Sequence, residues 1–281
     1  MKILFSIWFF LEDLEMILRN QDFHRGRLLL EYLKLKIKQI IQYKSSNTTI
    51  KYTKIFGFNV QFYNYKALIY MVKEVFIKSQ YHFETDSKEP FIIDCGANIG
   101  IPLLSFKMRY PGARIIAFEP ERMAFKVLSA NVENNKLKNV HLMNKAIYIR
   151  PGKLSFYYDA KNYASSISST VKGRVPDACC EEVDAVLLSD YIDRPVNFLK
   201  MDIEGAEGLI IAELASRNKL KLINEMVVEY HHHINPNEDN FSKILKILED
   251  NDFGYQIISL DRRVSGKRLF QDMLIYAYRK A

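Results

Sequence analysis

The sequence predicts an α/β fold with a doubly wound, mostly parallel sheet, and three observations support this. Residues 91–95 form a short apolar run that ends in a glycine turn, and residues 101–110 then have apolar residues at helical spacing. A second short run, 114–118, ends at an acidic residue, and a third, 196–201, ends in an acidic turn that precedes another helical segment. Short apolar runs that alternate with helices are typical of a parallel sheet covered on both faces.

The turn after the first run has the spacing Asp-x-Gly-x-Asn-x-Gly, formed by Asp94, Gly96, Asn98 and Gly100. A strand, a glycine turn and a helix together place a ligand at the carboxyl end of the strand. Glu119 ends the next predicted strand, about 20 residues further on, where an acid can reach both hydroxyls of a ribose. We therefore expect a nucleoside-containing cofactor.

The same turn bears on which cofactor that is. A nicotinamide-dependent oxidoreductase is disfavoured, because Asn98 and Ile101 stand where a dinucleotide fold needs glycine. The spacing instead resembles motif I of the class I S-adenosylmethionine-dependent methyltransferases, whose ligand has no phosphate. After the third strand, at residues 140–143, Asn144 lies where this class of fold meets the adenine, although an ordinary turn residue explains it equally well.

Two further strand ends carry acidic and basic groups. Asp202 and Glu204 follow the strand at 196–201, so they should face the glycine turn across one cleft. The strand after them ends in Glu229 and His231, the first of three consecutive histidines. A carboxylate at the end of a buried strand is costly unless it is paired, bound to a ligand or used in chemistry.

Composition restricts the partners and the compartment. The 281 residues are 48% hydrophobic, enough for one sizeable core and a smaller appended segment. The formal charge of +7 is scattered without a basic stripe, so we expect no nucleic-acid partner. Three cysteines, two of them adjacent, cannot form a disulfide framework, which favours a reduced, cytoplasmic setting.

The amino-terminal residues 1–49 predict a helical extension and a linker. The apolar stretch 1–11 is interrupted by acids before it reaches membrane-spanning length, and residues 25–43 have the pattern of a basic amphipathic helix. We interpret the two helices as a cap on the catalytic domain or on a second copy in a homo-oligomer. The alternative is peripheral contact with an anionic membrane or a lipid-linked substrate. Residues 50–63 then predict a hairpin, and 50–281 the main domain.

Two later segments also predict paired strands. Residues 146–158, broken at Pro151-Gly152, are expected to form an added hairpin. A helix at 240–251 precedes strands at 254–260 and 273–278, which are joined by a basic turn, 261–268. Two strands joined by a loop at the end of the chain predict an antiparallel pair at the sheet edge.

Four stretches together resemble the FkbM family of methyltransferases: residues 92–100, 117–120, 199–207 and 228–231. The resemblance covers about residues 50–281, and its most specific part is the Lys-x-Asp-x-Glu-Gly-x-Glu block that begins at Lys200. It implies a seven-stranded, Rossmann-like class I methyltransferase sheet with an antiparallel last strand. It also implies O-methylation of hydroxyls on sugars, glycolipids or natural products.

The resemblance assigns residues to S-adenosylmethionine by position. Those that would line its methionine part are Asp94, Gly96, Asn98 and Gly100. Glu119 would hold its ribose. Cys95 stands where a small or aliphatic residue is more usual.

A hydroxyl acceptor has a high pKa and needs help to lose its proton, and Asp202, Glu204 or His231 could act as the base. Asp202 with Glu229 and His231 could instead hold magnesium or manganese, a reading that we place behind base catalysis. A non-catalytic scaffold with the same fold is the alternative class. The intact turn residues, Glu119 and Asp202 argue against it.

Overall fold

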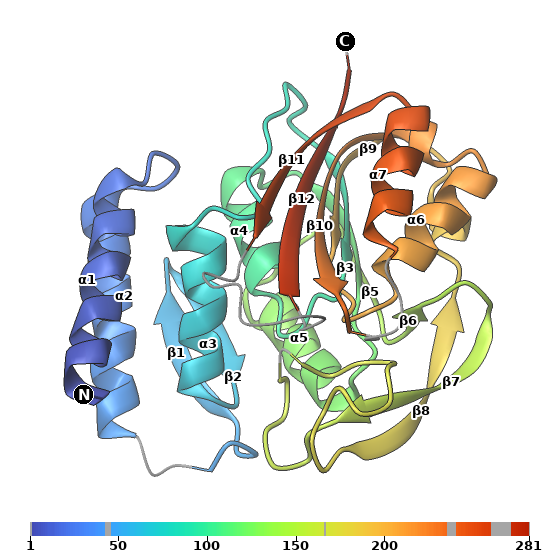
Figure 1. Ribbon diagram of the computed structural model, residues 1–281. Coiled ribbons are helices and arrows are strands. Elements are labelled where there is room, and N and C mark those ends of the chain that lie inside the picture. The colour runs from blue at the N-terminus through green and yellow to red at the C-terminus, as the bar shows by residue number, and fades with distance from the viewer. Residues whose placement is uncertain (1, 43–45, 166, 235–239, 260–270, 281) are drawn as a thin grey trace.

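The computed structural model describes residues 2–42, 46–165, 167–234, 240–259 and 271–280, and a seven-stranded sheet runs through its centre (Figure 1). Six strands are parallel, and β12 runs antiparallel to both of its neighbours. In spatial order the strands are β11 (Phe253–Ser259), β12 (Gln271–Arg279), β10 (Ile223–His232), β9 (Val196–Met201), β3 (Phe91–Cys95), β4 (Arg114–Phe118) and β5 (Val140–Met143). The predicted doubly wound sheet and its antiparallel edge pair are confirmed.

Side chains along the central strands alternate between two apolar cores, one on each face of the sheet. Ile92 and Phe198 belong to the first core, and their neighbours Ile93 and Leu199 belong to the second. The first face is covered by α3 (Tyr65–Val72) with its π-helical extension (Lys73–Ile77), α4 (Ile101–Arg109) and α5 (Arg122–Asn134). The second is covered by α6 (Glu207–Ser216), α7 (Phe241–Asp250) and the short 3-10 turns Leu188–Tyr191 and Leu220–Leu222. Burial on both faces explains why these strands have continuous apolar sequences.

The amino-terminal segment forms two helices, α1 (Lys2–Arg19) and α2 (Arg25–Ile41), at one end of the molecule (Figure 1). They pack against α3 and against the hairpin of β1 (Lys51–Ile55) and β2 (Phe58–Phe62), which was also predicted. Buried side chains of both helices join the first core, so the extension and the main domain share one apolar cluster.

The lysines of α2 are not a free surface. The ammonium of Lys34 donates to Glu31 and to the carbonyl of Lys54, and that of Lys38 donates to Thr53. Lys36 lies over the ring of Tyr32. The exposed side chains of α2 are basic at its start, at Arg25 and Arg27, and apolar further along, at Leu30, Ile37, Ile40 and Ile41.

The predicted hairpin at 146–158 is wrong in its pairing. Strands β6 (Ala146–Ile147) and β7 (Gly152–Tyr158) do not pair with each other, because both pair with β8 (Cys179–Val186). The alternation of β8 is weak, with exposed cysteines and acids at its start, and the sequence analysis missed it. The resulting three-stranded sheet lies beside the carboxyl ends of the central strands (Figure 1).

Two other expectations concern membrane-spanning helices and the basic turn near the end of the chain. None of the helices among the described residues has both the length and the apolar character needed to cross a membrane. The predicted basic turn, 261–268, lies outside the described residues.

Candidate active site

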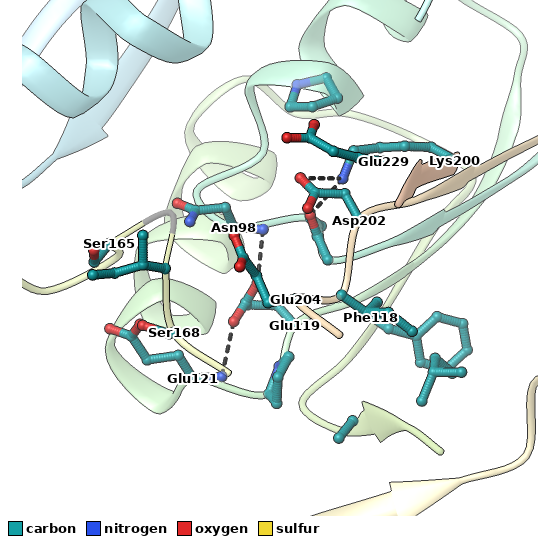
Figure 2. A pocket seen from close by; sticks show the side chains of 18 of the residues that line it. Asn98, Phe118, Glu119, Glu121, Ser165, Ser168, Lys200, Asp202, Glu204 and Glu229 are labelled. Carbon is teal, nitrogen blue, oxygen red and sulfur yellow. Dashed lines mark hydrogen bonds and ion pairs between the residues drawn. The ribbon is translucent and has the colours of Figure 1, made fainter. Parts of the chain in front are cut away.

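A cavity of about 280 Å³ opens where the carboxyl ends of β3, β4 and β9 meet (Figure 2). Its walls come from four segments far apart in the sequence: 96–98 after β3, 118–121 around the end of β4, 202–204 after β9, and the loop residues 165, 167, 168 and 170. Glu229 of β10 completes one side. The glycine turn and the acidic turn therefore face one cavity, as the order of parallel strands requires.

Gly96 is the point where the two turns touch. Its φ is +83°, and a Cβ on it would lie 1.8 Å from the carbonyl oxygen of Asp202. The amide of Asp202 also donates to the carbonyl of Cys95, at 3.1 Å. Only glycine fits here, because any side chain would push the two strand ends apart.

Glu119 is held rigidly at the end of β4. One carboxylate oxygen accepts from the amide of Asn98 and the other from the amide of Glu121, both at 2.8 Å (Figure 2). Burial, together with the nearby charge of Glu121, raises the pKa of Glu119 to about 8. The carboxylate lines the cavity, where it can accept hydrogen bonds from a pair of hydroxyls such as those of ribose.

Glu121 fastens the loop over the cavity, a role that the sequence analysis missed. Its carboxylate accepts from the amide of Ala164 and from the hydroxyl of Ser168, both at 2.8 Å. Burial raises the pKa of Glu121 to about 7. The acid two residues after Glu119 is the only sequence signal for this contact, and nothing local identifies its partners.

Asp94 and Lys200 form a buried ion pair behind the glycine turn. Their Cα positions are paired on adjacent strands, and the ammonium lies 3.3 Å from the Asp94 carboxylate. The same ammonium donates to the carbonyl of Gly96 at 2.7 Å and lies 3.7 Å from Asp202 (Figure 2). Asp94 is fully buried and does not line the cavity, so it acts on the turn through Lys200.

Asp202 and Glu204 differ in how strongly they are engaged. Asp202 lines the cavity with its side chain 28% exposed, and burial raises its pKa despite the opposing charge of Lys200. Glu204 has a left-handed backbone, with φ of 55°, and accepts two hydrogen bonds from Arg174, at 3.1 and 3.2 Å. Asp202 is therefore the more available of the two for chemistry in the cavity.

His231 is buried next to the cavity without lining it. Its Nδ1 lies 2.8 Å from Glu207, and its Nε2 lies 3.3 Å from Glu204. Burial lowers the pKa of His231, but the charges of Glu207 and Glu204 outweigh this and hold the pKa well above its usual value. A histidine that is already protonated is a poor base, which leaves Asp202 as the candidate for that role.

Besides Asp94, two more of the predicted cofactor residues lie outside the cavity lining. The Asn144 side chain donates to the carbonyls of Glu119 and Pro120, at 2.8 and 3.1 Å, and so braces the turn that carries Glu119. Gly100 begins α4 with φ of +90°, and a Cβ there would lie 2.7 Å from the side chain of Leu128. Both positions support the turns from behind.

Of the three histidines that end β10, only His231 joins the acidic cluster around Asp202 and Glu229 among the described residues. The rings of His232 and His233 stack on each other, with centroids 3.7 Å apart. The separation follows from the strand, since consecutive side chains point to opposite faces.

Comparison with known proteins decides the family. The sequence model of the Methyltransferase FkbM domain matches residues 94–257, which is more than half of the chain. The chain belongs to the FkbM family of methyltransferases. The matched segment contains both turns of the cavity and the β10 residues Glu229 and His231.

Individual relatives and solved structures are also similar to this chain. Methyltransferase sdnD from Sordaria araneosa is 29% identical over an alignment of 191 positions, and the match covers 57% of this chain and 73% of that protein. The 31-O-demethyl-FK506 methyltransferase FkbM from Streptomyces tacrolimicus is 25% identical over an alignment of 170 positions, and the match covers 50% of this chain and 65% of that protein. Among solved structures, the methyltransferase FkbM from Methylobacillus flagellatus has a TM-score of 0.43 and 18% identity, covering 76% of this chain and 54% of that one.

Proposed function

We propose that this FkbM methyltransferase transfers a methyl group from S-adenosylmethionine to a hydroxyl of a sugar, a glycolipid or another natural product. The observation that carries the proposal is the meeting of the Glu119 carboxylate and the Asp202 carboxylate in one cavity. The first suits a ribose, and the second suits the removal of a proton from an acceptor.

The residues present fit this cofactor. Glu119 offers both oxygens to the ribose hydroxyls, and Gly96 and Ala97 of the glycine turn line the cavity, where the methionine part of the cofactor would lie. Phe118, Ala146 and Ile147 supply an apolar wall beside Glu119, suited to a flat base. When bound, S-adenosylmethionine supplies a methyl group on a positively charged sulfur.

The chain itself must hold the acceptor oxygen in line with that methyl group and help the hydroxyl lose its proton. Asp202 is the cavity-lining carboxylate best placed to do so, because Glu204 is committed to Arg174 and His231 is already protonated. Burial raises the pKa of Asp202, which makes it a stronger proton acceptor than an exposed aspartate.

The acceptor class is supported by one relative. The protein from Streptomyces tacrolimicus is named as a methyltransferase of 31-O-demethyl-FK506, a name that places the transferred methyl group on an oxygen. Three hydroxyl side chains border the cavity and provide polar partners for such an acceptor: Ser165, Ser168 and Thr170.

The proposal is tested with Asp202→Asn. We expect turnover to fall by at least about a hundredfold, while the affinity for S-adenosylhomocysteine stays within a few-fold. Calorimetric titration gives the affinity, and Glu119→Ala serves as the opposite control because it should lose cofactor binding. Near-normal activity of Asp202→Asn would remove this residue from the mechanism, and a folded wild type that binds no S-adenosylhomocysteine would contradict the cofactor itself.

A further inference from the structure

Glu229 is a buried acid without a partner. Only 7% of the residue is exposed, and no hydrogen bond or ion pair joins its carboxylate to any residue in the described part of the chain. The sheet register explains its position: Val228 pairs with Met201, so Glu229 follows alongside Asp202 (Figure 2). A buried carboxylate normally has a partner, and an unpaired one at a cavity wall indicates that the partner is a ligand.

The nearest groups to Glu229 include two that can bind the same ion. Single ligand atoms of Asp202, Glu229 and His231 all lie within 4.8 Å of one another. An ion with ligands at about 2.1 Å holds neighbouring ligand atoms about 3 Å apart and opposite ones about 4.2 Å apart. The three side chains are therefore within a small rotation of a shared coordination sphere.

The orientation of His231 also fits a metal ligand. Glu207 lies 2.8 Å from Nδ1 and fixes the ring, so that Nε2 is directed toward the oxygens of Glu204, at 3.3 Å, and of Asp202 and Asp272, both at 3.9 Å. An ion bound at Nε2 would take the place of its proton. A carboxylate that holds the far nitrogen of a histidine is the usual support of a metal-binding imidazole.

The charges around the cluster leave room for a cation. Lys200 lies between Asp94 and Asp202, and its single positive charge is shared by these two carboxylates, at 3.3 and 3.7 Å. Arg174 is engaged with Glu204 at 3.1 Å. Neither cation forms an ion pair with Glu229 among the contacts of the described residues, although the charge of Lys200 is close enough to act on it. Carboxylates still outnumber cations on this side of the cavity.

We propose that Asp202, Glu229 and His231 bind one divalent cation of the magnesium or manganese class, and that the acceptor hydroxyl completes its coordination from the cavity. This inference rests on the proposed O-methylation. It makes Asp202 a ligand of the ion and no longer the base that takes the proton from the acceptor. From sequence alone a base was preferred to an ion, and the unpartnered Glu229 reverses that order.

The chemistry balances without another reactant. A hydroxyl bound to the ion has a lowered pKa, so its O–H bond breaks and the proton passes to water. The oxygen then bonds to the methyl carbon as the bond from that carbon to sulfur breaks, and sulfur keeps the electron pair. The products are the methyl ether, S-adenosylhomocysteine and one proton.

The test is a Mn²⁺ titration of the full chain saturated with S-adenosylhomocysteine, following free Mn²⁺ by electron paramagnetic resonance. We expect the wild type to bind one Mn²⁺ per chain, and Glu229→Gln to bind it about tenfold or more weakly. Glu182→Gln, a matched change at an exposed acid on β8, should leave Mn²⁺ affinity within about twofold of the wild type. Glu229→Gln should still bind S-adenosylhomocysteine like the wild type.

Two results would overturn the inference: a wild type that binds S-adenosylhomocysteine but no Mn²⁺, or Glu229→Gln binding Mn²⁺ as tightly as the wild type. Should Glu229→Gln fail to fold, the wild-type titration still decides. Failure of the proposed function is a separate result, because it appears as loss of S-adenosylhomocysteine binding, whatever the ion does.

Discussion

Replacing Lys200 with methionine tests how the buried pair with Asp94 supports the glycine turn. Asp94 is fully buried, and the ammonium of Lys200 at 3.3 Å is its compensating charge. Burial raises the pKa of Asp94, and Lys200 opposes that rise. Without Lys200 the carboxyl should stay protonated in the folded protein at neutral pH.

The expected cost follows from that proton. The unfolded chain releases it with a pKa of about 3.9, so keeping it at about pH 7 costs up to about 4 kcal/mol, at about 1.36 kcal/mol per pH unit. This agrees with the loss of about 3–5 kcal/mol that follows when one partner of a buried ion pair is removed. Since the folded-state pKa is raised, the penalty grows above the unfolded pKa and shrinks as pH falls. At about pH 5.5 it should be roughly half as large.

Urea unfolding followed by far-ultraviolet circular dichroism, at several pH values, measures this penalty against the wild type. Lys153→Met is the matched control, because Lys153 pairs with Asp184 at 2.8 Å on the surface, where solvent screens the pair, and its loss should cost much less than that of Lys200. In the double variant Asp94→Asn with Lys200→Met the pH dependence should vanish. A Lys200→Met penalty below about 1 kcal/mol, or one that does not change with pH, would refute the reasoning.

Two further predictions concern the cofactor site and the amino-terminal helices. Because the pKa of Glu119 is raised to about 8, binding of S-adenosylhomocysteine should tighten as pH rises toward that value, by up to about tenfold per unit, and level off above it. Calorimetry at several pH values measures this affinity, and Glu119→Gln should remove most of its dependence on pH. If the affinity of that variant depends on pH as that of the wild type does, another group causes the dependence. If α2 contacts a membrane through its exposed Ile40 and Ile41, the protein should co-sediment with anionic vesicles. The fraction that co-sediments should then fall in an Ile40→Ser, Ile41→Ser variant. If neither the wild type nor the variant co-sediments and the wild type is a dimer in solution, the homo-oligomer is favoured instead.

The sequence alone determined most of the fold and the position of the cavity. Apolar runs too short for helices, each followed by a helical segment, specify the parallel sheet, since both signals lie within a few residues of each other. Gly96 and Glu119 were recognisable from their spacing, because a turn and the strand that follows it are neighbours in the chain. The order of parallel strands then required the acidic turn at Asp202 to face them.

Tertiary structure decided what each of these groups can do. Lys200 donates to the carbonyl of Gly96 from 104 positions away, and Glu121 holds a hydroxyl 47 positions further on. The charges of Glu207 and Glu204 make His231 a poor base. Glu229 is a candidate ion ligand because its carboxylate has no hydrogen-bond or ion-pair partner among the residues that the structure describes. Protonation and coordination depend on the charges and the burial around a side chain, and long-range packing sets both.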